Sequence, residues 1–138
     1  MQDIFVSYSH ADRYFVEKLV SDLRSVDVDV FFNQMLIPGS FWIQSIDAKI
    51  SESEFFSPVL TNDYLESDEC MRQLKNAINL EKSRQLIIIP ILLSNCNIPE
   101  ILKSKIPADF SFNYDIGLND LLITVLHLAV GTDHYISA

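Results

Sequence analysis

The stretch Asp3-Ile-Phe-Val-Ser-Tyr-Ser-His-Ala-Asp-Arg13 joins a short apolar strand to an amphipathic helix through a polar elbow. Its apolar residues 4–6 end in the hydroxyl-bearing run 7–9. In an open α/β sheet, strands deliver such side chains to a ligand crevice at their carboxyl ends. Ser9 and Asp12 have the spacing of a capping box, which predicts the start of a helix. This stretch therefore indicates an α/β fold with a binding site beside its first strand.

Beyond the elbow, apolar periodicity predicts an alternation of helices and strands. Helices are predicted at 14–23, 40–53, 62–82 and 118–129, and strands at 26–33, 55–61, 86–93 and 110–112. Isoleucines 43, 46 and 50 form the expected core face of the second helix. The run 86–93 is apolar throughout, as in a strand covered on both faces, and its Pro90 predicts a local irregularity.

With the first strand, these segments make five strands that alternate with helices. This order predicts a flavodoxin-like fold, a five-stranded parallel sheet with helices on both faces and right-handed crossovers. A chain of 138 residues suits one domain, which we place at 1–130. Residues 131–138 lack periodicity and are expected to be a tail or the start of a linker.

Composition excludes several classes of partner. The formal charge of -9 argues against nucleic acid and anionic membrane, which favour clustered basic residues. No apolar run approaches the roughly 20 residues that span a bilayer, so we expect a cytoplasmic protein. The histidines and the two cysteines lack zinc-site spacing, and reduced thiols are expected rather than a disulfide framework. We therefore expect no metal.

Four segments in order resemble the TIR (Toll/interleukin-1 receptor) domain of the bacterial immune-effector type. Ile4-Phe-Val-Ser-Tyr-Ser-His-Ala-Asp-Arg13 resembles the first strand and elbow of that family, and Val30-Phe-Phe with Leu36-Ile-Pro-Gly39 resembles its second strand and BB loop. Pro58-Val-Leu-Thr-Asn-Asp-Tyr-Leu65 and Ile88-Ile-Pro-Ile-Leu-Leu93 resemble its third and fourth strands. Each motif alone is weak, but their order and spacing are specific.

The resemblance implies cleavage of NAD at its nicotinamide glycosidic bond, with NAD as substrate and no further cofactor. Such chemistry needs a carboxylate that stabilises an oxocarbenium-like state or acts as nucleophile. In the family, a pattern similar to Ser-x-Trp-Cys-x-x-Glu-Leu carries it, and the matching stretch is Ser67-Asp-Glu-Cys-Met-Arg-Gln-Leu74. Gln73 therefore stands at the catalytic Glu position and Glu69 stands where Trp is common, so the chain is expected to be inactive or nearly so.

Three explanations of Gln73 remain open. The natural protein is a TIR domain without catalytic activity, or a glutamate was replaced to trap substrate, or Glu69 substitutes from one turn earlier. Glu69 and Gln73 are related as i and i+4, so they lie on one helix face within reach of each other.

The resemblance also suggests substrate contacts, each with an ordinary structural alternative. Phe41 would stack on the rings of the substrate or pack in the core, and Trp42 would line the pocket, join an assembly contact or pack in the core. Tyr8 and Ser9 would touch ribose or phosphate, although capping alone explains Ser9. The last two candidates, Arg13 for the pyrophosphate and Asn33 for a ribose hydroxyl, have solvated and turn roles as alternatives.

Partners follow from the same resemblance. TIR domains assemble with one another into homo-oligomers or filaments, and they sit beside a sensor domain in longer proteins. The alternative function is therefore a non-catalytic signalling scaffold that works through TIR to TIR contact. A fused or associated sensor is a further expectation.

Overall fold

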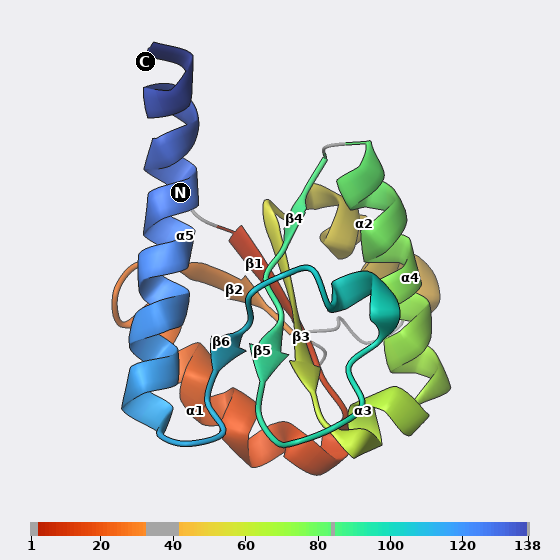
Figure 1. Ribbon diagram of the computed structural model, residues 1–138. Coiled ribbons are helices and arrows are strands. Elements are labelled where there is room, and N and C mark those ends of the chain that lie inside the picture. The colour runs from red at the N-terminus through yellow and green to blue at the C-terminus, as the bar shows by residue number, and fades with distance from the viewer. Residues whose placement is uncertain (1–2, 33–41, 84, 138) are drawn as a thin grey trace.

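The computed structural model describes residues 3–32, 42–83 and 85–137, and its centre is a parallel sheet (Figure 1). The strands are β1 (Asp3–Ser7), β2 (Asp29–Phe31), β3 (Phe55–Leu60), β4 (Ile87–Ile88), β5 (Ile91–Leu92) and β6 (Ala108–Asp109). Their order is β2-β1-β3-β5-β6, with β4 also paired to β3, and every pairing is parallel. The predicted α/β flavodoxin-like sheet is confirmed.

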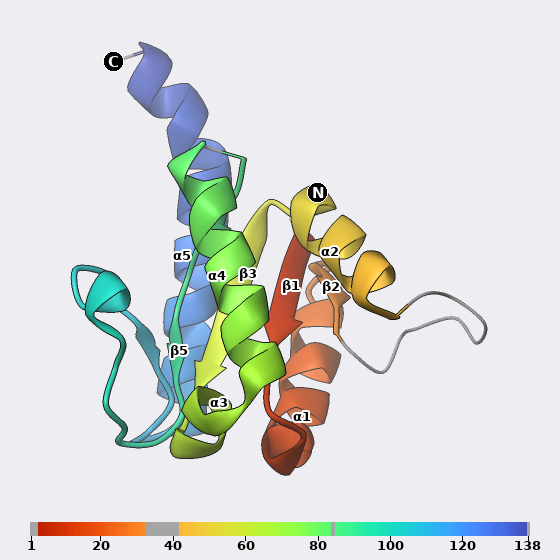
Figure 2. The same ribbon diagram turned by 90° about the vertical axis from the view of Figure 1, so that its right-hand side faces the viewer.

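Helices cover both faces of the sheet. They are η1 (His10–Asp12), α1 (Arg13–Arg24), α2 (Trp42–Glu52), α3 (Asn62–Glu66), α4 (Asp68–Lys82), η3 (Glu100–Leu102) and α5 (Tyr114–Ser137). One apolar core lies between the sheet and helices α1 and α5, and a second lies between the sheet and helices α2, α3 and α4. Figure 2 shows the two layers, with α4 in front of the sheet and α5 behind it.

The register of the central strands brings two chain turns to one edge of the sheet. Ser7, the last residue of β1, is paired with Pro58 of β3. The elbow after β1 and the turn from β3 into α3 therefore leave the sheet side by side, because parallel strands end at the same edge. Thr61 and Asp12 join these two turns through a hydrogen bond of 2.8 Å between Thr61 Oγ1 and Asp12 Oδ2.

Pro90 divides the most apolar segment, as the sequence predicts. β4 ends at Ile88 and β5 begins at Ile91, so the strand is interrupted where proline has no N–H to donate. The carbonyl oxygen of Pro90 still accepts a hydrogen bond of 2.9 Å from the Ala108 amide. The interruption leaves the order of the sheet unchanged.

The second strand begins later than predicted. Val26 is 51% exposed and belongs to the turn after α1, while Val28 and Val30 are buried. The turn has a Schellman pattern, in which the Val28 amide bonds to the Leu23 carbonyl and Asp27 adopts a φ of 65°. The alternation of valines therefore starts inside a helix cap.

The helix predicted at 62–82 is two helices. Ser67 lies between α3 and α4 with an extended ψ of 115°, and its Oγ caps α4 by accepting from the Cys70 amide at 3.2 Å. The apolar stripe continues across this break, so periodicity alone did not reveal it. The break directs the first turn of α4 toward the end of β1.

Other boundaries also differ from the predictions. Ile43 is 50% exposed, so the core face of α2 is made by Ile46 and Ile50. The last strand is residues 108–109 rather than 110–112. α5 runs from Tyr114 to Ser137, so it begins before and ends after the helix predicted at 118–129.

Across the described segments 3–32, 42–83 and 85–137, no helix has both the length and the apolar character needed to cross a membrane.

Candidate active site

A chain of polar side chains, buried except at its outer end, joins the end of β1 to the first turns of α4. Ser7 Oγ donates to Gln73 Oε1 at 2.7 Å and also lies 2.9 Å from the Tyr64 hydroxyl. The amide nitrogen of Gln73 donates to Glu69 Oε2 at 2.9 Å. We call Ser7, Gln73 and Glu69 the polar chain. It occupies the edge of the sheet where the sequence predicts a crevice.

Arg72 fixes the outer end of the polar chain. Its Nε and Nη2 bind the two carboxylate oxygens of Glu69, each at 2.8 Å, and its Nη1 binds Asp47 of α2 at 2.8 Å. A bidentate pair of this kind sets the orientation of the carboxylate as well as its charge. Glu69 is therefore held in one position, and the Asp47 contact ties that position to α2.

The donors and acceptors of the polar chain fit only one arrangement of the Gln73 amide. An ionised Glu69 only accepts hydrogen bonds, so the amide nitrogen must face it and the amide oxygen must face Ser7. Because Ser7 gives its proton to Gln73, the Tyr64 hydroxyl is the donor to Ser7, and this hydroxyl also lies 3.3 Å from the Cys70 carbonyl oxygen. Gln73 is 4% exposed, so this amide is a buried group with both ends hydrogen-bonded.

The ionisation of the groups along the chain follows from these contacts. Burial alone would raise the pKa of Glu69, but hydrogen bonds from Arg72 and Gln73, with the guanidinium charge, lower it below its ordinary value. Burial raises the pKa of the Tyr64 hydroxyl far above its usual range. The site at neutral pH therefore contains a carboxylate at Glu69, a neutral amide at Gln73 and neutral hydroxyls.

Cys70, beside the polar chain, is not activated. Burial raises the pKa of its thiol, and the nearby charges of Glu69 and Asp12 raise it further despite a bond to Ser67. A thiol in such surroundings is a poor nucleophile.

Tyr8 and Ser9 of the elbow make contacts within the chain, and their proposed contacts with ribose or phosphate stay predictions. Tyr8 is 7% exposed, belongs to the core beside α1, and packs against Phe32 with ring centroids 6.3 Å apart. Ser9 caps η1 by accepting from the Ala11 amide at 3.3 Å. The predicted capping box is incomplete, because the Asp12 carboxylate binds Thr61 instead.

The guanidinium of Arg13 lies near its own helix start. Its Nη2 is 3.2 Å from the Tyr14 hydroxyl, and its Cζ is 4.6 Å from the centroid of that ring. Its proposed contact with a pyrophosphate stays a prediction.

The remaining candidates cannot be placed. Asn33 and Phe41 lie outside the described residues, and Trp42 begins α2 but its side chain is not described. Their proposed substrate contacts also stay predictions.

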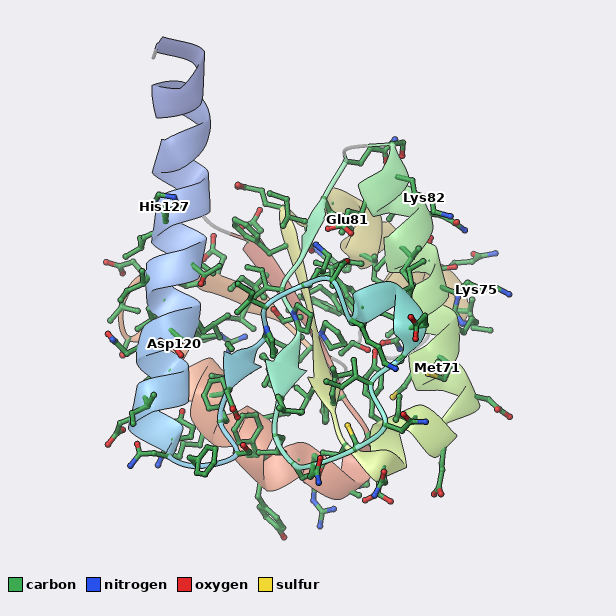
Figure 3. The ribbon with its side chains drawn as sticks, in the orientation of Figure 1. Met71, Lys75, Glu81, Lys82, Asp120 and His127 are labelled. Carbon is green, nitrogen blue, oxygen red and sulfur yellow. The ribbon has the colours of Figure 1, made fainter. Side chains whose placement is uncertain are left out.

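Three members of the site were not singled out from the sequence. Tyr64 and Asp47 are brought in by tertiary packing, which no local pattern encodes. Arg72 follows Glu69 by three residues, and that i, i+3 spacing was a usable signal of an ion pair. By contrast, Lys75 and Lys82 of α4 project away from the sheet and take no part in the site (Figure 3).

A separate cavity lies at the opposite end of the strands. It has a volume of about 360 Å³ and is lined by the first residues of β1 and β2 and by Arg24, Lys49 and Glu52. Because Asp3 and Asp29 begin their strands whereas Ser7 ends one, this cavity is not part of the polar chain.

The fold agrees with a family comparison. The family model described as TIR domain matches residues 4–122. The chain belongs to the TIR domain family. Curated relatives of this TIR domain include the NAD(+) hydrolase PdTIR of Paracoccus denitrificans (strain Pd 1222), which is 32% identical over 91 residues. The 2' cyclic ADP-D-ribose synthase AbTIR of Acinetobacter baumannii (strain 1295743) is 26% identical over 91 residues.

These matches cover part of each relative. Each includes 64% of this TIR domain chain, but only 30% of the Paracoccus protein and 34% of the Acinetobacter protein. The chain therefore spans about a third of the curated relatives that it matches.

Solved structures support the fold. The TIR domain of the Toll-related receptor TRR-2 from Hydra magnipapillata has a TM-score of 0.72 at 22% identity, with 96% of this chain and 98% of that chain covered. The TIR domains of the activated Roq1 resistosome, which recognises the pathogen effector XopQ, have a TM-score of 0.62 at 24% identity, with 66% and 57% covered. These similarities establish the TIR fold of the chain.

Proposed function

We propose that this TIR domain binds NAD at the carboxyl ends of β1 and β3 and cleaves its nicotinamide glycosidic bond poorly or not at all. The observation that carries the proposal is the Gln73 amide, which stands at the catalytic Glu position of the family and is hydrogen-bonded at both ends. A neutral amide does not stabilise an oxocarbenium-like state, and the loss of one preorganised electrostatic group costs about 3 to 4 kcal/mol.

The names of the curated relatives support NAD as the ligand. One is a NAD(+) hydrolase and another is a 2' cyclic ADP-D-ribose synthase. Glycoside cleavage needs a carboxylate beside the anomeric carbon and no metal or organic cofactor, so no further cofactor is proposed.

The test measures binding and cleavage separately. NAD is titrated into the purified chain by calorimetry, and nicotinamide release is followed by chromatography at high protein concentration. We expect saturable binding with release at or near background. Rapid nicotinamide release by the unaltered chain would refute the impaired activity, and absence of binding would refute the NAD site.

A second candidate function is a scaffold that acts by TIR to TIR assembly. The favouring observation is again Gln73, because a buried amide whose ends are both paired serves the fold without any ligand. Light scattering across a concentration series tests this candidate, with Pro38→Ala and Phe41→Ala as variants of the loop 36–41 that we place at the interface. Association that these variants weaken, without dependence on NAD, would favour the scaffold, and a strictly monomeric chain would refute it.

The wider context is also part of the proposal. We place a sensor domain beside this module, fused or associated, because the chain spans only a third of its curated relatives. We place the protein in the cytoplasm on the basis of its two free cysteines.

A further inference from the structure

Within the polar chain, the negative charge lies on Glu69. At residue 73 the helix offers a neutral amide that is 4% exposed, whereas the Glu69 side chain is 26% exposed. Glu69 lies one turn nearer the start of α4, and its Oε2 is 2.9 Å from the Gln73 nitrogen. A ligand that reaches this end of α4 therefore meets the carboxylate before it meets the amide.

The charges around Glu69 do not cancel. Arg72 is the cation bound to it, and the same guanidinium also binds Asp47. Two carboxylates share one guanidinium, so these three side chains carry an excess of one negative charge. The hydrogen bonds that hold Glu69 also keep it ionised at neutral pH, as its lowered pKa indicates.

The position of this charge is fixed before any ligand binds. Both oxygens of Glu69 are bonded, to Arg72 on one edge and to Arg72 and Gln73 on the other. A carboxylate held in this way costs little reorganisation when a cation approaches it. Asp12 is another carboxylate at this edge, and it accepts a hydrogen bond from Thr61. Its pKa is raised, mainly by burial and also by the charge of Asp63, although the Thr61 bond acts in the opposite direction.

A fixed negative charge can separate the two redox forms of a nicotinamide dinucleotide. The oxidised ring carries a positive charge and the reduced ring is neutral, while the adenosine, ribose and phosphate groups are the same in both. We infer that Glu69 is a specificity-determining residue that makes this site select an oxidised, cationic nicotinamide dinucleotide over the reduced form. This inference rests on the proposed NAD site.

The experiment compares NAD and NADH on three forms of the chain by calorimetric titration. The forms are the unaltered chain, Glu69→Gln, and the matched control Glu54→Gln, which removes the same charge at an exposed position near the amino end of β3. We expect the unaltered chain to bind NAD about fivefold more tightly than NADH, the effect of one half-exposed ion pair. Glu69→Gln should bring the ratio close to one with little change for NADH, and Glu54→Gln should preserve it.

The ratio of the NAD and NADH affinities reports the effect of the charge on the nicotinamide ring, because general damage to the site would weaken the binding of both ligands together. Raising the ionic strength should also reduce the preference, since salt screens exposed charges. Equal binding of NAD and NADH by the unaltered chain, or a preference that survives Glu69→Gln, would overturn this inference alone. Binding of neither dinucleotide would overturn it together with the proposed function.

Discussion

Ser7 Oγ at the end of β1 donates a hydrogen bond of 2.7 Å to Oε1 of Gln73 on α4. This contact, together with the Glu69 bond to the opposite end of the amide, sets the orientation of Gln73. Residue 73 is therefore a structural link between the sheet and α4, at the position that the sequence resemblance assigns to the catalytic carboxylate of the family. We expect the same atoms to affect both stability and cleavage, so both can be tested by substitution.

Removal of the Ser7 hydroxyl should destabilise the protein. Ser7→Ala leaves the buried oxygen of Gln73 and the Tyr64 hydroxyl without this partner, and an unpaired buried polar group costs about 1 to 3 kcal/mol. The measurement is the free energy of unfolding from urea denaturation.

Ser57 on the neighbouring strand is the matched control. It is fully buried, and within the described residues its Oγ has no hydrogen-bond partner. Ser57→Ala should leave the free energy of unfolding unchanged or raise it by about 1 kcal/mol, because an unpaired hydroxyl is removed. Equal losses in the two variants would show that the polar chain has no special role in stability.

A glutamate at residue 73 should create a carboxylate pair that shares a proton. Gln73→Glu places a second carboxylate about where the amide nitrogen lies 2.9 Å from Glu69, and two such groups cannot both ionise freely. The pKa of one is raised, so the folded variant binds more protons than the unfolded chain and its stability falls as pH increases above about 5. We expect a loss of about 2 kcal/mol at pH 7, equivalent to one or two pKa units.

Unfolding of the Gln73→Glu variant and of the unaltered chain is measured from pH 4 to 8 in steps. A difference between them that does not change with pH would contradict the shared proton.

Glu69 should make the stability of the unaltered chain depend on pH in the acid range. Because its pKa in the folded state is below its ordinary value of 4.5, its stabilising contribution is present above that value and is lost as pH falls below it. Glu69→Gln should be less stable than the unaltered chain at pH 7, by less than about 1 kcal/mol for a pair so close to solvent. The difference should shrink between pH 4.5 and 3.

Asp12 is present in both proteins, so its contribution cancels in the difference between their free energies of unfolding. Burial raises the pKa of Asp12, so that group acts in the opposite direction in both proteins. A difference that grows as the pH is lowered would refute this role of Glu69.

Gly117 should be intolerant of alanine although it lies in a helix. A Cβ there would lie 2.5 Å from Phe110 Cγ and 2.8 Å from the Asp109 carbonyl oxygen, so α5 and the chain after β6 would have to separate. We expect Gly117→Ala to lower the free energy of unfolding by about 1 to 3 kcal/mol, as overpacking does. An exposed helical glycine would instead gain about 1 kcal/mol from the same change.

The control for this prediction is Asn119→Ala, at an exposed position of the same helix, which should be neutral or slightly stabilising. A stabilised Gly117→Ala variant would mean that α5 packs less closely than described.

The alternation of strands with helices and the irregularity at Pro90 could be predicted, because they depend on local apolar runs and on a missing N–H. The break at Ser67 could not, since the apolar stripe crosses it and only the cap on the Cys70 amide reveals it. The late start of β2 was hidden for a similar reason, because Asp27 adopts a positive φ that its sequence context does not require.

In the site, as in the fold, contacts set by local spacing could be predicted and contacts set by tertiary packing could not. The contact between Glu69 and Gln73 follows from i, i+4 spacing, and the structure confirms it. The contacts of Ser7 with Tyr64 and Gln73 join residues 57 and 66 positions apart, so they depend on how α3 and α4 pack against the sheet. Periodicity carries no information on such pairs.

Nicotinamide release from NAD by three forms of the chain tests most directly the claim that residue 73 limits cleavage. The forms are the unaltered chain, Gln73→Glu, and Gln73→Glu combined with Glu69→Gln, which removes the competing carboxylate. We predict release near background for the first, a small gain for the second, and a gain of roughly 10² to 10³ for the third. A folded double variant that releases no more nicotinamide than the unaltered chain would contradict the claim.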